Sequence, residues 1–337
     1  MQTLLARTLA VLGLGLAAAA PTAHAADNVH LMLDFIPTGD YAPYYSGIAN
    51  GIYEKHGIDL KITRGTGSGD TVLKVAGGAA DIGLADISAI LTSRQNSQTP
   101  IKAIASTFSH SAHSLFVLKD SGITNFSGLE GKKIAVSPGN SHKLYFPMVA
   151  RKANTDPDKI QWVTVDGSSM APLLINGKVD AAPFLATNYY YQNKQAKRFG
   201  KEIVVLPFSD QGFNIYALSV FTTDKTLAER PQMVQNFLNA TIEAWEAARK
   251  DPDTACQAHV KANPEIDLDD CMGNLNAVLG YIYTDFSAEH GVGSLAEGRM
   301  KNTYEAVAEA QSLDPAWDYH QAYDTQFIVK ANGTAKP

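Results

Sequence analysis

The stretch LMLDFIPTGDYAPYY, residues 31–45, decides how the rest of the chain is interpreted. It opens with three apolar residues, which is typical of a strand buried on both faces of a parallel sheet. Polar and turn-forming residues follow, together with the aromatic rings of Phe35, Tyr41, Tyr44 and Tyr45. In an open α/β sheet, ligands bind beyond the carboxyl ends of the strands. We therefore expect a buried strand, then a ligand-facing loop, and then a helix.

Residues 1–25 have the pattern of an export signal. Arg7 precedes an apolar run, Leu9–Ala20, that is too short to span a membrane, and the small-residue triplet Ala-His-Ala ends at Ala25. We therefore expect a mature chain that begins at Ala26 and works in the periplasm.

Composition narrows the class of partner. The formal net charge of the chain is -6, and it becomes -7 without Arg7, the one charged residue among residues 1–25. An acidic chain of this kind argues against a nucleic-acid partner. About 310 residues remain after a signal of this length, which is more than one hydrophobic core usually holds, so two lobes are expected.

The chain has two cysteines, Cys256 and Cys271. Export would place them in an oxidising compartment, where we expect a disulfide that closes a loop of about 15 residues and contributes roughly 3 kcal/mol. His259 alone does not complete a metal site with them. We expect neither a metal ion nor a cofactor.

Strands and helices alternate from Val29 onward, beginning with a strand at Val29–Leu33 and a helix at Pro43–Lys55. This alternation is typical of βαβ units and a parallel sheet. The plan then recurs, because VLKVAGGAADIGLA from Val72 is echoed by PLLINGKVDAAPFLA from Pro172. An internal repeat of this size predicts two similar lobes.

Two apolar strands, Leu115–Lys119 and Ile215–Phe221, flank the second copy. We expect them to pair as the crossings between the lobes and to act as the hinge. The second copy would then be an inserted lobe, and the helices after Phe221 would pack around the first lobe.

Five segments of the chain carry a family resemblance: DFIPTGDYAPYYSGIANGIYEKHGIDL, GSGDTVLKVAGGAADIGLADISAI, GLEGKKIAVSPGN, GKVDAAPFLA and FNIYALSVFTTD. In this order they resemble the NMT1/THI5-like (SsuA/ThiY-like) family of periplasmic solute-binding proteins, whose members bind thiamine-pyrimidine precursors, riboflavin, sulfonates, taurine or nitrate. The pattern at Asp34, Phe35, Pro37, Asp40 and Tyr41 is most similar to that of the pyrimidine-precursor binders. Those proteins commonly have Trp where this chain has Phe35.

The resemblance implies a two-lobed α/β fold of the type II-like periplasmic binding proteins, in which each lobe is a mostly parallel sheet flanked by helices. Lobe I would comprise residues 26–116 and 219–337, and lobe II residues 117–218. The family resemblance also implies that the two lobes close about a hinge and that the ligand lies in the cleft between them. The implied partner is the permease of an ABC importer in the inner membrane, and nothing in the sequence indicates an oligomer.

The expected cleft offers hydrogen-bond acceptors and aromatic rings, which suit a flat, nitrogen-rich ligand. Asp34 and Asp40 would accept hydrogen bonds from ring or amino groups. Phe35 and Tyr41 of lobe I, with Phe184 or Tyr189 of lobe II, would stack on the two faces of a ring.

Polar side chains at strand-to-helix turns complete the expected site, since helix amino ends and Gly-rich turns offer donors to a ligand. Asp86 suits a helix cap as well as a ligand contact, and His113 suits either cleft hydrogen bonding or a solvated loop. The polar-loop residues expected in the cleft are Ser68, Asp86, His113, Ser137, Gly139, Asn140, Ser141 and Asn188.

These observations predict a binding protein that captures a small aromatic heterocycle, such as a thiamine-precursor pyrimidine. The alternative is a sulfonate or aromatic carboxylate anion, held by the Ser137 loop with His142 and Lys143. An enzyme acting on a pyrimidine is the third hypothesis, but the sequence contains no Ser-His-Asp spacing, P-loop or zinc motif.

Overall fold

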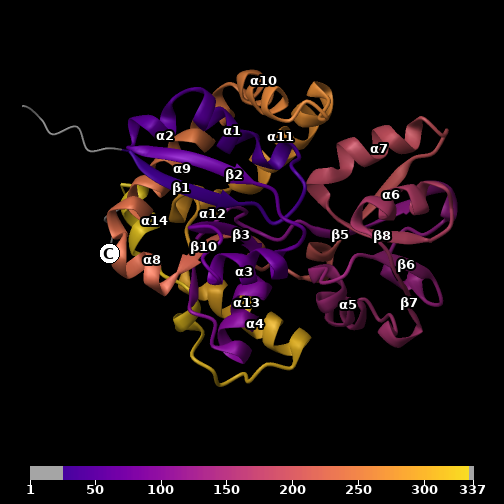
Figure 1. Ribbon diagram of the computed structural model, residues 1–337. Helices are drawn as coiled ribbons and strands as arrows, with labels where there is room; N and C mark the ends of the chain where they lie inside the picture. Colours follow the sequence, from indigo (N-terminus) through magenta and orange to yellow (C-terminus); the bar gives the residue numbers. More distant parts are fainter. Residues whose placement is uncertain (1–25, 334–337) are drawn as a thin grey trace, which may run out of the picture.

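Two five-stranded sheets organise the computed structural model, which describes residues 26–333 (Figure 1). The first sheet contains, in order across it, β2 (Ile58–Thr63), β1 (Asp27–Met32), β3 (Ile82–Asp86), β10 (Leu218–Thr223) and β4 (Ile101–Ser106). The second contains β7 (Gln161–Thr164), β6 (Lys133–Val136), β8 (Ala181–Leu185), β5 (His113–Leu118) and β9 (Ile203–Pro207). The predicted export signal lies outside the described residues.

The two sheets share one plan, as the internal repeat predicts. In each, the second strand across the sheet pairs in parallel with its two neighbours: β1 with β2 and β3, and β6 with β7 and β8. One antiparallel strand then lies between the third strand and the last, β10 in the first sheet and β5 in the second. The echoed sequences occupy equivalent places, since each supplies a helix and the strand beside the antiparallel one. The two-lobed α/β fold is therefore confirmed.

The predicted pairing of Leu115–Lys119 with Ile215–Phe221 is wrong, because β5 and β10 lie in different sheets. Both strands are almost wholly buried, so each is used inside its own sheet. The chain instead passes between the sheets along residues 107–112 and 208–217. The expected boundary at residues 116 and 117 falls inside β5, and we propose the two connecting segments as the hinge in place of the strands.

Helices cover both sheets, and their bounds follow local signals. The helix expected at Pro43–Lys55 is two helices, because Gly51 has a positive φ of 68° that interrupts it. The helices of the amino-terminal and second lobes are α1 (Ala42–Ala49), α2 (Ile52–Lys55), α3 (Ser68–Ala76), α4 (Ile87–Ser97), α5 (Ser141–Lys152), α6 (Gly167–Ile175) and α7 (Tyr189–Lys197).

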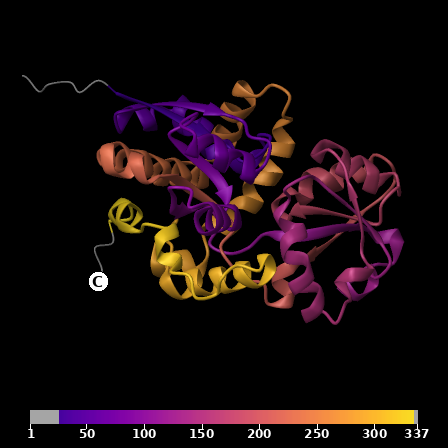
Figure 2. The same cartoon turned by 60° about the horizontal axis from the view of Figure 1, so that its bottom comes forward.

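The carboxyl-terminal helices pack mainly on the first sheet, as expected, but the helix at Glu297–Gln311 also packs against α5 of the second lobe (Figure 2). Their bounds are α8 (Asp224–Glu229), α9 (Pro231–Lys250), α10 (Pro252–Ala262), α11 (Leu268–Ile282), α12 (Asp285–His290), α13 (Glu297–Gln311) and α14 (Gln326–Ala331). Trp245 of α9 is buried against Tyr44 of α1, with their ring centroids 6.2 Å apart. Among residues 26–333, no helix is long and apolar enough to cross a membrane.

Candidate ligand-binding site

The loop after β1 places two carboxyl groups where the lobes meet. Asp34 follows the end of the strand, and its Oδ1 accepts a hydrogen bond from the Tyr41 hydroxyl at 2.8 Å. Burial raises the pKa of Asp34 to about 7, although the bond from Tyr41 acts in the opposite direction. A carboxyl group that titrates near neutrality is suited to recognising a hydrogen-bond donor or a cation.

Asp40 joins three parts of the chain. It lies in the one-turn helix η1 (Gly39–Tyr41) and accepts hydrogen bonds from Asn274 Nδ2 of α11 at 2.7 Å and from Thr187 Oγ1 at 3.2 Å. Thr187 belongs to lobe II, in the one-turn helix η5 (Ala186–Asn188). Burial raises the pKa of Asp40 to about 6, while the bonds from Asn274 and Thr187 lower it. Asp40 is therefore held by both lobes.

Gly39 allows this loop to lie directly on α11. A Cβ atom at Gly39 would lie 2.4 Å from the carbonyl oxygen of Cys271 and 2.6 Å from Cβ of Asn274. Such distances are shorter than any ordinary contact, so only glycine fits. The position of Asp40 is thus set by the backbone of a helix far along the chain.

Asp86, at the end of β3, forms the helix cap that its sequence context suggested and also contacts lobe II. It caps α4 by accepting the Ser88 N–H at 2.9 Å, and its Oδ2 lies 3.2 Å from Nε2 of His113 in lobe II. Tyr145 of α5 also donates its hydroxyl to Asp86 Oδ1, at 3.3 Å. Burial alone would raise the pKa of Asp86, but the interactions with His113 and Ser88 hold it below its usual range. Ser68 accepts the Asp86 N–H at 2.9 Å, which fixes the turn.

His113 is buried between hydroxyl groups as well as beside Asp86. Ser111 Oγ lies 2.7 Å from its Nδ1 and Ser141 Oγ lies 3.1 Å from its Nε2. A serine hydrolase needs the carboxylate and the nucleophile on opposite ring nitrogens. Here Asp86 and Ser141 share Nε2. Ser111 lies on the opposite nitrogen, Nδ1, but it is buried and its hydroxyl also accepts the backbone N–H of His113 at 3.2 Å, so it is not open to a substrate.

The loop of residues 137–141 serves mainly to start α5. Asn140 caps the helix by accepting the His142 N–H at 3.0 Å, and its Nδ2 donates to Ser137 Oγ at 3.3 Å. Gly139 is exposed and has a φ of 69°, which favours glycine. Burial, with the nearby His113, lowers the pKa of His142 well below its usual value, so His142 is uncharged.

The aromatic residues of the predicted sandwich are only partly brought together. Phe35 reaches lobe II, because a Cβ atom on Gly167 of α6 would lie 3.1 Å from its ring. Phe184 packs on Phe116 of its own sheet, with ring centroids 5.2 Å apart, and Tyr189 packs edge-on against the same ring. Tyr189 also accepts a hydrogen bond from Asn193 at 3.1 Å, and Asn188 makes no side-chain cap at the start of α7.

The chain is similar to known proteins. The family model described as NMT1/THI5 like matches residues 38–255, which is more than half of the chain. The chain belongs to the NMT1/THI5-like family. The resemblance inferred from the five sequence segments is therefore confirmed.

Individual relatives of this NMT1/THI5-like protein are distant in sequence. Riboflavin-binding protein RibY of Chloroflexus aurantiacus is 24% identical over 325 residues, which cover 92% of this chain and 91% of that protein. The formylaminopyrimidine-binding protein of Halalkalibacterium halodurans is 21% identical over 232 residues, 68% of this chain and 69% of that protein. The alkanesulfonate-binding protein SsuA of Xanthomonas axonopodis, solved with MOPS, has a TM-score of 0.66 at 12% identity, covering 90% of this chain and 97% of that one. This structural similarity supports the periplasmic binding protein fold.

Sequence reasoning missed two residues that hold Asp40 in the candidate site. Asn274 and Thr187 both donate to Asp40. Thr187 is the neighbour of the predicted site residue Asn188, so the sequence pointed to the right segment but to the wrong side chain. Asn274 lies 234 residues from its partner, and no local pattern marks it.

Proposed function

We propose that this protein is the ligand-binding component of an ABC importer and that it captures a small amino-substituted heterocycle, such as a thiamine-precursor pyrimidine, between its lobes. It works in the periplasm as a monomer and delivers the ligand to a permease in the inner membrane. Family membership supports the class of protein, and two relatives are named for binding riboflavin and a formylaminopyrimidine.

The choice of ligand rests on three carboxyl groups at the lobe boundary, of which Asp40 and Asp86 are buried and Asp34 is half-buried. Burial raises the pKa of Asp34 and Asp40, whereas His113 and Ser88 already offset the burial of Asp86. A ligand that donates hydrogen bonds from amino or protonated ring groups would offset this cost. Amino-pyrimidines supply such donors together with a flat ring for Phe35.

The anion hypothesis fits the same residues poorly. That hypothesis needs positive charge from Lys143 and His142. Lys143 is exposed, with its Nζ 5.5 Å from the Trp162 ring, and the lowered pKa of His142 leaves it uncharged. Three carboxyl groups at the boundary would also repel a sulfonate or a carboxylate.

Capture would proceed by closure of lobe II onto lobe I about residues 107–112 and 208–217. Contacts that join the lobes include Thr187 to Asp40 and Tyr145 to Asp86, and opening about these segments would break them. A ligand that contacts both lobes shifts the equilibrium toward closure by its differential affinity. We propose binding without turnover, since the hydroxyl that lies opposite Asp86 on the His113 ring, that of Ser111, is buried.

Isothermal titration of the mature protein tests the proposal. The probes are the amino-hydroxymethyl-methylpyrimidine precursor of thiamine, riboflavin, and an alkanesulfonate. We expect a heterocycle to bind, the sulfonate to give no heat, and Asp40→Asn to weaken binding by more than about tenfold, since hydrogen bonds to charged groups contribute about 1.5–3 kcal/mol. Asp70→Asn is the matched control, because Asp70 is a half-exposed lobe I carboxylate paired with Lys74 at 2.7 Å. Binding of the sulfonate alone would contradict the proposal, and recovery of a chemically altered pyrimidine would favour the enzyme.

A further inference from the structure

Helix α7 of lobe II meets α11 of lobe I through a ring placed on a glycine. A Cβ atom on Gly273 would lie 2.1 Å from both Cγ and Cδ1 of Tyr190. The ring therefore occupies the space that any other residue at Gly273 would fill. Among the three consecutive tyrosines at the start of α7, Tyr190 lies on Gly273.

A second contact lies one turn further along α7. Lys194 Nζ is 3.0 Å from Asp267 Oδ1 and 2.8 Å from Asp270 Oδ1, both at the amino end of α11. Residues four apart share one face of a helix, so Tyr190 and Lys194 approach lobe I together. These two aspartates raise the pKa of Lys194 further above its already high value, which keeps the ammonium charged.

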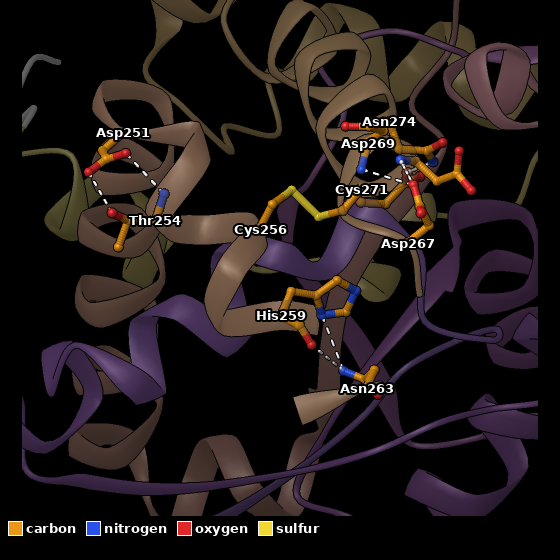
Figure 3. The surroundings of a disulfide bond; sticks show 11 residues. Asp251, Thr254, Cys256, His259, Asn263, Asp267, Asp269, Cys271 and Asn274 are labelled. Atoms are coloured by element: carbon orange, nitrogen blue, oxygen red, sulfur yellow. Dashed lines mark hydrogen bonds between the residues drawn. A yellow bond between two sulfur atoms is a disulfide. The ribbon is translucent and has the colours of Figure 1, made fainter. Parts of the chain in front are cut away.

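The receiving turn of α11 is also the turn that holds the candidate site. A disulfide joins Cys256 of α10 to Cys271 of α11, as the sequence predicted (Figure 3). Asn274 follows Gly273 directly and donates to Asp40 at 2.7 Å. One cross-linked helix end thus contacts both the second lobe and the carboxyl group that we assign to ligand recognition.

We propose that Tyr190, Gly273 and Lys194 form a closing clasp that the protein makes without ligand. The clasp consists only of side chains and backbone of this chain, so it needs no ligand atom, and we expect it to favour the closed arrangement in the unliganded protein. Through Asn274 it orients Asp40 before a ligand arrives. The proposal depends on hinge closure and not on the identity of the ligand.

Two glycines of α11 provide a matched pair of variants. Alanine is favoured over glycine inside a helix, so Gly280→Ala, where a Cβ would meet no atom within 4 Å, leaves closure intact and raises the melting temperature by about 2–4 °C. Gly273→Ala has the same effect on the helix but collides with Tyr190. We therefore expect small-angle X-ray scattering of the unliganded protein to match the closed structure for the wild type and Gly280→Ala. Gly273→Ala should show a larger radius of gyration.

Removing the ring should relieve the collision, so the double variant Tyr190→Ala with Gly273→Ala should return toward the wild-type radius of gyration. Lys194→Glu gives an independent test, because it places a third negative charge beside Asp267 and Asp270 and should open the protein. Lys197→Glu, at an exposed position of the same helix, should not. An open wild-type protein, or equal scattering from the two glycine variants, would overturn the proposal. Neither result would bear on which ligand binds.

Discussion

Replacing Asp40 by Asn should stabilise the unliganded protein at neutral pH while weakening ligand binding. Asn keeps the shape of the side chain and an oxygen that can accept from Asn274, and its amide can donate to the Thr187 hydroxyl. What it removes is a buried negative charge. The variant should therefore gain the free energy that the wild type spends on ionising Asp40 inside the fold.

The size of the gain follows from the pKa. Burial raises the pKa of Asp40 from 3.8 to about 6. Each unit corresponds to about 1.4 kcal/mol, so the fully ionised group costs the folded state about 3 kcal/mol. Asp40 is 6% exposed, so solvent screens little of this cost.

The gain should also depend on pH in a defined direction. Because the folded-state pKa is the higher one, the wild type loses stability as pH rises through the window from 3.8 to about 6. Below this window the carboxyl group is protonated in both states and the variant has no charge advantage. The advantage of Asp40→Asn should be about 1 kcal/mol near pH 4.5 and about 3 kcal/mol near pH 7.5.

Urea unfolding of both proteins across this pH range measures the difference in unfolding free energy directly. Asp70→Asn is the control and should show no gain, because Lys74 and Thr66 lower the pKa of Asp70. A wild type that is more stable than Asp40→Asn near pH 7.5, or a difference that does not change with pH, would refute the assignment of a buried charge to Asp40.

Three further predictions test the framework around the site. Reducing the disulfide should lower the free energy of unfolding by about 3 kcal/mol in urea titrations with and without reductant, because it closes a loop of 15 residues; a loss below about 1 kcal/mol contradicts this. Gly39→Ala should destabilise the fold by about 1–3 kcal/mol through collision with Cys271, whereas Gly69→Ala, in helix α3 with no atom within 4 Å of its Cβ, should not lower the stability in thermal unfolding. His113→Phe should cost about 3–5 kcal/mol near neutral pH by leaving Asp86 buried beside an apolar ring, and most of that loss should vanish when the carboxyl group is protonated near pH 3; a loss independent of pH would show that packing alone is responsible.

The sequence was informative where one short segment determines its own structure. The strands predicted at Val29–Leu33, Leu115–Lys119 and Ile215–Phe221 are present as β1, β5 and β10, with bounds shifted by one to three residues. The fold class followed from their alternation with helices and from the internal repeat. The Cys256–Cys271 bridge followed from the number of cysteines.

Partners distant in sequence could not be predicted in the same way. A strand buried on both faces, such as β5, shows no preference for a neighbour, so its pairing within the second sheet was missed. Asp40 was identified as a site residue, but nothing near it indicates that Asn274 and Thr187 hold it. The break at Gly51 was missed because a single glycine inside a helical pattern is often tolerated.

The central claim is that the carboxyl groups between the lobes recognise a donor-rich heterocycle. Isothermal titration of the wild type and Asp40→Asn with the amino-hydroxymethyl-methylpyrimidine precursor of thiamine tests it most directly. We predict saturable binding to the wild type with one site per chain, and affinity reduced by more than about tenfold in the variant. Unchanged affinity in Asp40→Asn, or binding of an alkanesulfonate in place of the pyrimidine, would contradict the claim.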